Sequence, residues 1–202
     1  MAGASKLNGQ PMMNRQTLAP ALLSALLFST TPILAQPTPV AGAEQEIKAE
    51  QASKVELKAF RQVKVALATA IAAAKTHTRG GVVVDASFDA GNGKPSYKVK
   101  TYQNSSVWEG IVDAASGQVT GAGKTTPESE LDQEDKAELA GLQQATTTLA
   151  QAVDIAEGQV AGKAISAGLE ETNGKIVFEV MVLKNGSVRK IVIDPKTGQI
   201  LT

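Results

Sequence analysis

The chain has 202 residues, of which 43% are hydrophobic and 3% aromatic, so it is long enough for one ordinary domain or two small ones. Lys and Arg number 20, and Asp and Glu also number 20, which leaves no basic excess to bind nucleic-acid phosphates or an anionic membrane surface. The absence of cysteine excludes a disulfide framework, a thiolate metal site, a cysteine nucleophile and a lipid-modified cysteine, and the single histidine, His77, excludes a histidine-rich metal site.

The first 35 residues are typical of an export signal. Two basic residues and no acidic residue precede an apolar run at residues 21–28. This run has the length of a signal-peptide core and is shorter than the ~20 apolar residues that a membrane span needs. We predict cleavage after Ala35, with Ala41-Gly42-Ala43 as the alternative site, a linker at residues 36–52, and a mature protein that is periplasmic or secreted and not inserted in the membrane. An uncleaved membrane anchor is the alternative.

A helix is predicted after this linker. Leu67, Ala70, Ile71 and Ala74 recur at helical spacing in an alanine-rich stretch, so one side of the helix is apolar. The preceding residue, Ala66, has no side chain that can cap the helix, and two consecutive glycines follow where it must end.

Extended runs follow the helix at residues 82–88, 97–102 and 107–112. The second run alternates apolar and polar residues, which is typical of a strand with one buried face. Asn92-Gly93 supplies the positive φ angles that a tight hairpin requires. The pattern predicts three antiparallel strands in a meander.

The remainder of the chain repeats this pattern after a polar, Gly-rich and acidic linker at residues 121–134. Leu67 corresponds to Leu149 at an offset of 82, whereas Tyr97 corresponds to Phe178 at an offset of 81, so one residue has been lost between helix and sheet. Thr148 is the predicted N-cap of the second helix. The second set of extended runs covers residues 163–169, 176–183 and 188–193.

The expected fold is α+β, with two repeated modules at residues 53–120 and 135–202. In each module a helix packs on a three-stranded antiparallel meander, because this is the smallest layered arrangement that buries both the helical stripe and the apolar face of the strands.

Each module resembles the PepSY pattern, in which an Ala-rich helix precedes an aromatic-x-Val element and a strand ending in Asp-x-x-Thr/Ser-Gly-x-Val/Ile. The first copy has Tyr97-Lys98-Val99 with Asp113 to Val119, and the second has Phe178-Glu179-Val180 with Asp194 to Ile200. The resemblance implies an extracytoplasmic module that binds or inhibits peptidases, or that occupies another protein or peptide partner. It supplies no catalytic residue.

Trp108 is the main candidate for contact with a partner, because the second copy has Arg189 at the same position and the duplicated scaffold therefore does not require an apolar group there. If Trp108 points outward beside Lys98, Lys100 and Tyr102, the first sheet presents an aromatic and basic face suited to a peptide. The alternative is that Trp108 packs on a short lead-in helix, expected at residues 54–60, or on the other module.

The remaining conspicuous residues are interpreted structurally. His77 is expected in an exposed turn just after a helix, with a functional base or ligand as the alternative. Asp113 and Asp194 are expected to accept hydrogen bonds from turn amides, and Gly117 and Gly198 to adopt the left-handed conformation. A calcium site would need further oxygen ligands at alternating positions, which the sequence does not supply.

These observations favour a non-catalytic binding protein over an enzyme, because one histidine, no cysteine and scattered carboxylates do not form a convergent catalytic set. No catalytic, cofactor or metal site is predicted. We expect both modules to engage a protein or peptide, for example a peptidase that is inhibited or regulated, with no nucleic-acid partner. The alternative is a structural or envelope-stress accessory protein without a specific ligand.

Overall fold

The computed structural model describes residues 54–91 and 93–201. The predicted export signal, the linker at residues 36–52 and Asn92 lie outside the described residues. A helical segment at residues 54–60 opens the described chain. The first copy then consists of α2 (Leu67–His77), β1 (Val82–Asp89), β2 (Ser96–Gln103), β3 (Ser106–Asp113) and β4 (Val119–Pro127).

A connection with the 3-10 turn η1 (Glu128–Glu130) and the helix α3 (Gln133–Leu142) leads into the second copy. Its elements are α4 (Leu149–Val160), β5 (Lys163–Thr172), β6 (Lys175–Lys184), β7 (Ser187–Ile193) and β8 (Ile200–Leu201). Both predicted helices and all six predicted strands are present, with bounds that differ from the expected ones by a few residues at most.

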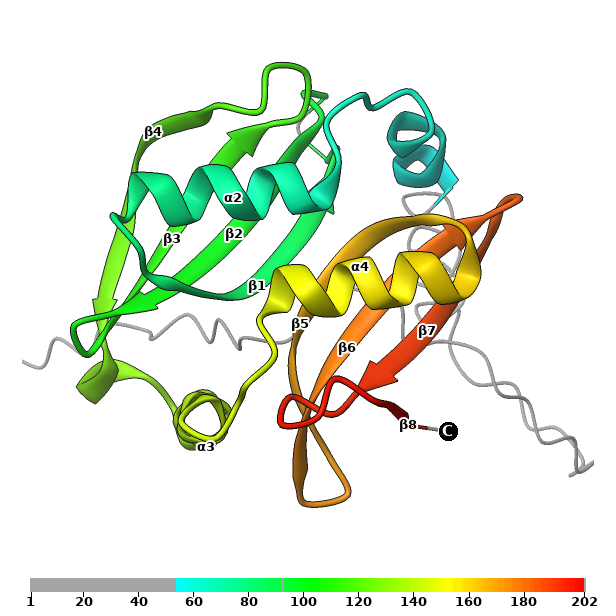
Figure 1. Ribbon diagram of the computed structural model, residues 1–202. Coiled ribbons are helices and arrows are strands. Elements are labelled where there is room, and N and C mark those ends of the chain that lie inside the picture. The colour runs from blue at the N-terminus through cyan, green and yellow to red at the C-terminus, as the bar shows by residue number, and fades with distance from the viewer. Residues whose placement is uncertain (1–53, 92, 202) are drawn as a thin grey trace, which may run out of the picture.

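All eight strands lie in one antiparallel sheet, in the order β4-β3-β2-β1-β5-β6-β7-β8 (Figure 1). The helices α2 and α4 lie side by side across one face of this sheet, α2 over β1, β2 and β3 and α4 over β5, β6 and β7 (Figure 1). The helix α3 packs against β5 and β6. The α+β class is therefore confirmed, with both copies contributing to a single sheet.

The structure corrects the expected three-stranded meander. β4 and β8 add a fourth antiparallel strand to each copy, and β1 pairs with β5 to join the copies. Residues 121–127, which the composition assigns to a linker, continue β4. Most side chains of β4 are exposed, so its sequence lacks the apolar alternation that reveals a strand with one buried face.

Within each copy, the equivalent residues pair across the strands. Tyr97 stands opposite Val112 in the first copy, and Phe178 stands opposite Ile193 in the second. A register shift also recurs at the same place in β1 and β5. The helices start at Leu67 and Leu149, which are 82 residues apart, whereas the paired strand residues Tyr97 and Phe178 are 81 residues apart. The predicted loss of one residue between helix and sheet is therefore confirmed.

Local signals in the sequence determine where the helices and hairpins begin and end. The Thr148 hydroxyl accepts a hydrogen bond from the Gln151 amide at 3.3 Å, which confirms the predicted N-cap, whereas Ala66 makes no side-chain bond to α2. Asn173 and Asn185 have φ angles of 53° and 52°, and each precedes a glycine that also has a positive φ. These values are the ones that tight two-residue hairpins require.

The core lies between the two helices and the sheet. Tyr97 is fully buried there, and its hydroxyl donates a hydrogen bond to the carbonyl oxygen of Val65 at 2.6 Å. Phe60, from the lead-in segment, meets the Phe88 ring edge-on at a centroid distance of 5.1 Å. Small side chains allow the helices to approach the sheet closely, and the fully buried ones are Ala70, Ala74, Ala152 and Ala156.

Candidate functional site

Trp108 lies on the face of the sheet that the helices cover. Alternation along β2 places the buried side chains of Tyr97 and Thr101 on this face, and Trp108 on β3 stands opposite Thr101. The second copy has Arg189 opposite Val182 at the same register position. Trp108 therefore does not share a face with Lys98, Lys100 and Tyr102, contrary to the outward arrangement considered from the sequence.

The indole ring of Trp108 is held over two glycines and beside the end of α2. A β-carbon on either Gly110 or Gly123 would collide with the ring, so these residues make room for it. The indole Nε1 donates a hydrogen bond to the Ala122 carbonyl oxygen at 3.0 Å. The ring centroid lies 5.0 Å from that of His77, with an interplanar angle of 36°. Contacts from α2, β3 and β4 thus fix the ring in place.

Two shallow hollows of about 430 and 550 Å³ meet at His77 and form what we call the α2–β4 groove. One hollow lies between Trp108 and the end of α2, and the other runs along α2 towards the start of β4. The walls include Thr69, Ala72, Ala73 and Thr76 from α2, and Gln118, Val119, Ala122 and Thr125 from β4 and the turn before it.

The groove depends on small residues that the second copy replaces with larger ones. By the helix and strand offsets, Ala73 corresponds to Ile155, and Gly110 corresponds to Ile191. The Cδ1 atom of Ile155 reaches within 3.6 Å of a β-carbon position on Gly198, so this side chain occupies the space that stays open beside Ala73. The first copy alone combines the hollow with a tryptophan.

The groove is lined mainly by uncharged side chains. His77 is the one titratable side chain among the residues that line it, and the others are Thr, Ser, Asn, Gln, Ala, Gly, Val119 and Trp108. The hydroxyl of Thr101, which borders the groove, is buried and has no hydrogen-bond partner within the described chain. The groove thus offers hydrogen-bonding groups around one aromatic surface.

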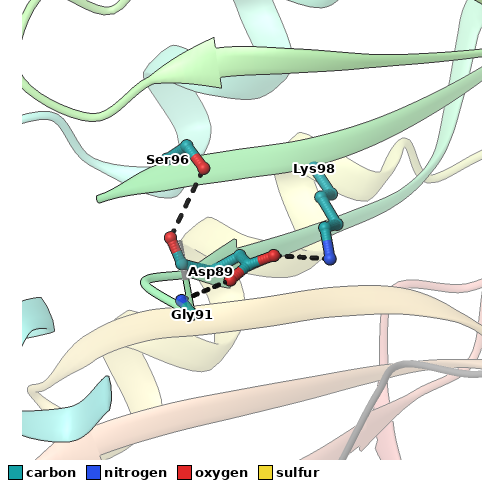
Figure 2. Close-up of polar contacts among 4 residues, drawn as sticks. All are labelled: Asp89, Gly91, Ser96 and Lys98. Atoms are coloured by element: carbon teal, nitrogen blue, oxygen red, sulfur yellow. Dashed lines mark hydrogen bonds and ion pairs between the residues drawn. The ribbon is translucent and has the colours of Figure 1, made fainter. Parts of the chain in front are cut away.

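Lys98 is held in an ion pair at the β1–β2 hairpin. Its ammonium lies 2.5 Å from Asp89 Oδ2, and Asp89 Oδ1 also accepts a hydrogen bond from the Gly91 amide at 2.7 Å (Figure 2). Burial raises the pKa of Asp89, but the bonds from Lys98 and Gly91 outweigh burial and hold the pKa below its ordinary value. This lysine contacts an acid of its own chain.

Lys100 and Tyr102 also face acidic groups of the same chain. The Tyr102 hydroxyl donates a hydrogen bond to Glu128 Oε2 at 2.6 Å. Lys100 stands opposite Asp85 on β1 and Glu109 on β3. The face that carries Lys98, Lys100 and Tyr102 is therefore a mixed-charge surface and not a basic one.

Comparison with known proteins identifies the family. The family model PepSY, described as "Peptidase propeptide and YPEB domain", matches residues 64–122 and 147–202. The chain belongs to the PepSY family. No curated protein matches the chain. A crystal structure of a candidate lipoprotein from Clostridium difficile 630 is similar at 24% identity and a TM-score of 0.40, covering 70% of this chain and 93% of that one.

The turn that ends the PepSY pattern is built as the sequence predicts. Asp113 Oδ1 accepts hydrogen bonds from the amides of Ala115 and Ser116 at 3.0 and 2.7 Å. The bonds from Ser116 and then Ala115 lower the pKa of Asp113. Asp194 accepts the corresponding bond from the Lys196 amide.

The described residues contain no group of three or more His, Cys, Asp or Glu that could hold a metal ion.

This PepSY chain holds two buried carboxyl groups and one half-buried carboxyl group where its two copies meet. Asp85 is 6% exposed and Glu138 is 3% exposed, while Glu170 is half-buried and projects from β5. One oxygen each of Asp85 and Glu170 is buried without a hydrogen-bond partner in the described part of the chain. Burial is the largest cause that raises their pKa values, to about 7 for Asp85, about 8 for Glu138 and about 7 for Glu170.

Within the residues that the structure describes, no helix of this PepSY protein has the length and apolar character of a membrane span.

Sequence reasoning missed the partners of Trp108 in this PepSY module. His77 was expected in an exposed turn, and it is instead the last residue of α2, exposed and in ring contact with Trp108. Gly110 and Ala73 carry no motif. The comparison of the two copies contains the signal, because both positions hold isoleucine in the second copy.

Proposed function

We propose that this PepSY protein is an exported, non-catalytic binding protein, and that the α2–β4 groove holds an extended segment of a protein or peptide partner. A peptidase that the protein inhibits or regulates is the partner that the family description favours. The observation that carries this function is the groove itself. Small residues open it beside an aromatic ring in the first copy, where the second copy has isoleucines.

The dimensions and chemistry of the groove fit an extended peptide with small or polar side chains. The wall formed by α2 is lined by Ala and Thr, which leave room for a backbone to approach. Trp108 and His77 offer flat surfaces for a side chain or a peptide plane.

We assign the partner contact to Trp108 and leave Lys98, Lys100 and Tyr102 out of it. The last three side chains face acids of their own chain on the opposite side of the sheet. Charged groups that are already paired contribute little to a new exposed contact.

We also propose the organisation of the whole chain. Residues 1–35 form the export signal and residues 36–52 a linker, and the mature protein acts in the periplasm or outside the cell. The two PepSY modules extend over residues 53–120 and 135–202, and residues 121–134, of which 121–127 complete β4, form the connection between them. The match of the family model to both regions supports this division.

Affinity capture from an envelope extract tests the proposed function. Trp108→Arg and Ala73→Ile each introduce the residue that the second copy carries at the same position, so the fold should accept them. Both variants should lose the proteins that the wild-type chain captures. Arg189→Ala, at the matching place in the second copy, is the control and should capture them as the wild type does. Equal capture by all four proteins would contradict the groove as the binding site.

A further inference from the structure

A hollow of about 450 Å³ lies where the lead-in segment, residues 54–60, meets the second copy. This segment lies beside the hairpin that joins β6 and β7 (Figure 1). The lining residues come from the end of the lead-in segment, the start of β5 and the hairpin, and they are Phe60, Arg61, Lys163, Leu183, Asn185 and Gly186. None of them lines the α2–β4 groove, so the hollow is a separate candidate site with a volume typical of small-ligand pockets.

Two cations line this hollow, and no acid does. Arg61 and Lys163 are both exposed, and neither has an ion-pair partner in the described part of the chain. Glu157 is the acid closest to Lys163 along the chain, but its Oε1 accepts a hydrogen bond from the Ala164 amide at 2.7 Å and it does not line the hollow. Because two like charges repel each other, an anion that enters the hollow removes a repulsion and gains two attractions.

The hairpin turn lies against the guanidinium of Arg61. Its Nη2 atom is 2.7 Å from the place where a β-carbon on Gly186 would stand, so glycine leaves room for it. Asn185 and Gly186 have φ angles of 52° and 86°, as the two central residues of a tight turn require. A guanidinium presents two parallel N–H donors, which match the two oxygens of a carboxylate. The hollow thus presents a carboxylate-binding group at its wall.

An apolar surface lies next to these charges. Phe60 is 4% exposed and Leu183 is 8% exposed, so both belong to the core and show only an edge to the hollow. A ligand that fits needs a carboxylate and an apolar group close together. The last residue of a polypeptide has both on one carbon atom when its side chain is apolar. A free amino acid also carries an ammonium group, which the two cations repel.

The corresponding positions of the other copy lack the two cations. β1 and β5 pair at two equivalent alanines, so an approximate twofold axis relates the copies and the hollow can be compared with its counterpart. Arg61 corresponds to Gln143 at the helix offset of 82. Lys163 corresponds to Val82 at the strand offset of 81. The duplicated scaffold therefore does not require a cation at either position.

From this combination we infer that the hollow binds the C-terminal carboxylate of a peptide whose last side chain is apolar. Arg61 and Lys163 hold the carboxylate, and the apolar side chain packs on the edges of the two core residues. Cleavage of any polypeptide generates such chain ends. The hollow acts independently of the α2–β4 groove, which holds an extended segment and has no cationic side chain among its lining residues other than His77 when protonated.

Calorimetric titration of the full chain with four probes tests this inference. The probes are N-acetyl-Gly-Ser-Gly-Leu with a free carboxylate, its C-terminal amide, N-acetyl-Gly-Ser-Gly-Gly with a free carboxylate, and inorganic phosphate. At low salt the leucine-ended acid should bind at least about tenfold more tightly than its amide, because charge-assisted hydrogen bonds are the stronger ones. The glycine-ended acid and phosphate should bind more weakly, since neither has an apolar side chain. The NMR resonance of the Gly186 amide should shift as the leucine-ended acid binds.

Four variants separate the site from a general loss of charge or fold. Arg61→Gln and Lys163→Val each introduce the residue of the corresponding position, so the fold should accept them, and each should weaken binding of the leucine-ended acid by at least about tenfold. Lys175→Gln removes an exposed cation at the other end of β6 and should bind as the wild type does. Trp108→Arg, which alters the groove, should also bind as the wild type does. Circular dichroism checks that each variant is folded.

Four results would overturn the inference. Equal affinity for the leucine-ended acid and its amide would show that the carboxylate is not recognised, and this comparison needs no variant. Phosphate binding as tight as that of the leucine-ended acid would show a general anion site. Unchanged binding in both the Arg61 and Lys163 variants would place the peptide elsewhere, and loss of binding in Trp108→Arg would place it in the groove. Whether the groove holds a partner is decided separately, by the capture experiment.

Discussion

Asp85 and Gly168 stand directly opposite each other on β1 and β5, where the two PepSY copies join. A β-carbon on Gly168 would lie 2.8 Å from Asp85 Oδ2, so only glycine leaves room for this carboxyl group. The seam contains three residue pairs, of which this is the first and the other two are Ala86 with Ala167 and Ser87 with Ser166. The few residue pairs that join the two copies therefore include one, Asp85 with Gly168, in which the acid requires a glycine opposite it.

Replacing Gly168 with alanine should destabilise the fold. The added methyl group would press on a carboxyl group that is buried and cannot move into solvent, which should cost about 1–3 kcal/mol in the free energy of unfolding. Urea denaturation measures this loss. Gly158→Ala in α4 is the control, because nothing lies within 4 Å of its β-carbon position and alanine should stabilise the helix by up to about 1 kcal/mol. A Gly168→Ala chain as stable as the wild type would contradict the packing at the seam.

The stability of the protein should fall as the pH rises from 6 to 9. Folding raises the pKa values of Asp85 and Glu170 to about 7 and of Glu138 to about 8, from ordinary values of 3.8 for Asp and 4.5 for Glu. The folded state therefore binds these protons more tightly than the unfolded chain does. The resulting stabilisation is complete below the ordinary values and is lost as the pH rises through about 7 to 8.

Charged groups from every neighbouring element act on these three carboxyls. Lys100 lowers the pKa values of Asp85 and Glu138, and Lys190 lowers that of Glu170. Nearby acids raise the three pKa values. Glu170 raises those of Asp85 and Glu138, and the other acids that contribute are Glu109, Glu134, Asp135 and Glu179. Because the acids outnumber the two lysines, deprotonation on going to alkaline pH should weaken the contact between α3 and the seam.

Thermal unfolding across this pH range measures the effect. The midpoint should fall by about 5 °C or more between pH 6 and 9 for the wild type. Asp85→Asn cannot lose a proton here, so its profile should be flatter, whereas Glu171→Gln changes an exposed neighbour and should leave the profile as it is. A wild-type midpoint that does not change over this interval would show that the carboxyls are already ionised when folded.

Tyr97→Phe should lower stability through the loss of one buried hydrogen bond. The second copy has Phe178 at this position, so a phenyl ring fits the site, and the missing group is the hydroxyl that donates to the Val65 carbonyl oxygen. The expected loss is about 1 kcal/mol in the free energy of unfolding. Tyr102→Phe removes a more exposed bond to Glu128 and should cost less. If the two variants lose equal stability, the buried bond to Val65 contributes nothing beyond an exposed one.

Much of the fold could be predicted from local patterns. Helical spacing from Leu67 to Ala74, the Asn-Gly turns and the offset between Tyr97 and Phe178 predict the helices, the hairpins and the duplication. The fourth strand could not be predicted, because an exposed edge strand such as β4 needs no apolar alternation. The shared sheet could not be predicted either, since its seam contains Asp85 and a glycine where apolar pairs would be expected.

The face of Trp108 was the main ambiguity at the candidate site. Along β3, Val107 and Ile111 occupy one face and Trp108 and Val112 the other, so both faces carry apolar residues and alternation does not distinguish them. The register with β2 decides the question, because Trp108 pairs with Thr101 rather than with Tyr102. Thr101 is polar but buried, so the sequence does not indicate that its side of β2 faces the core.

Fluorescence of Trp108 tests the central claim most directly, because it is the one tryptophan in the chain and it lies in the α2–β4 groove. The full chain is titrated with the partner that affinity capture identifies. We predict a saturable change in Trp108 emission that is lost in Ala73→Ile, which fills the groove without touching the fluorophore's own position. Binding of that partner with unchanged Trp108 emission would contradict the groove as the place where this PepSY protein holds its ligand.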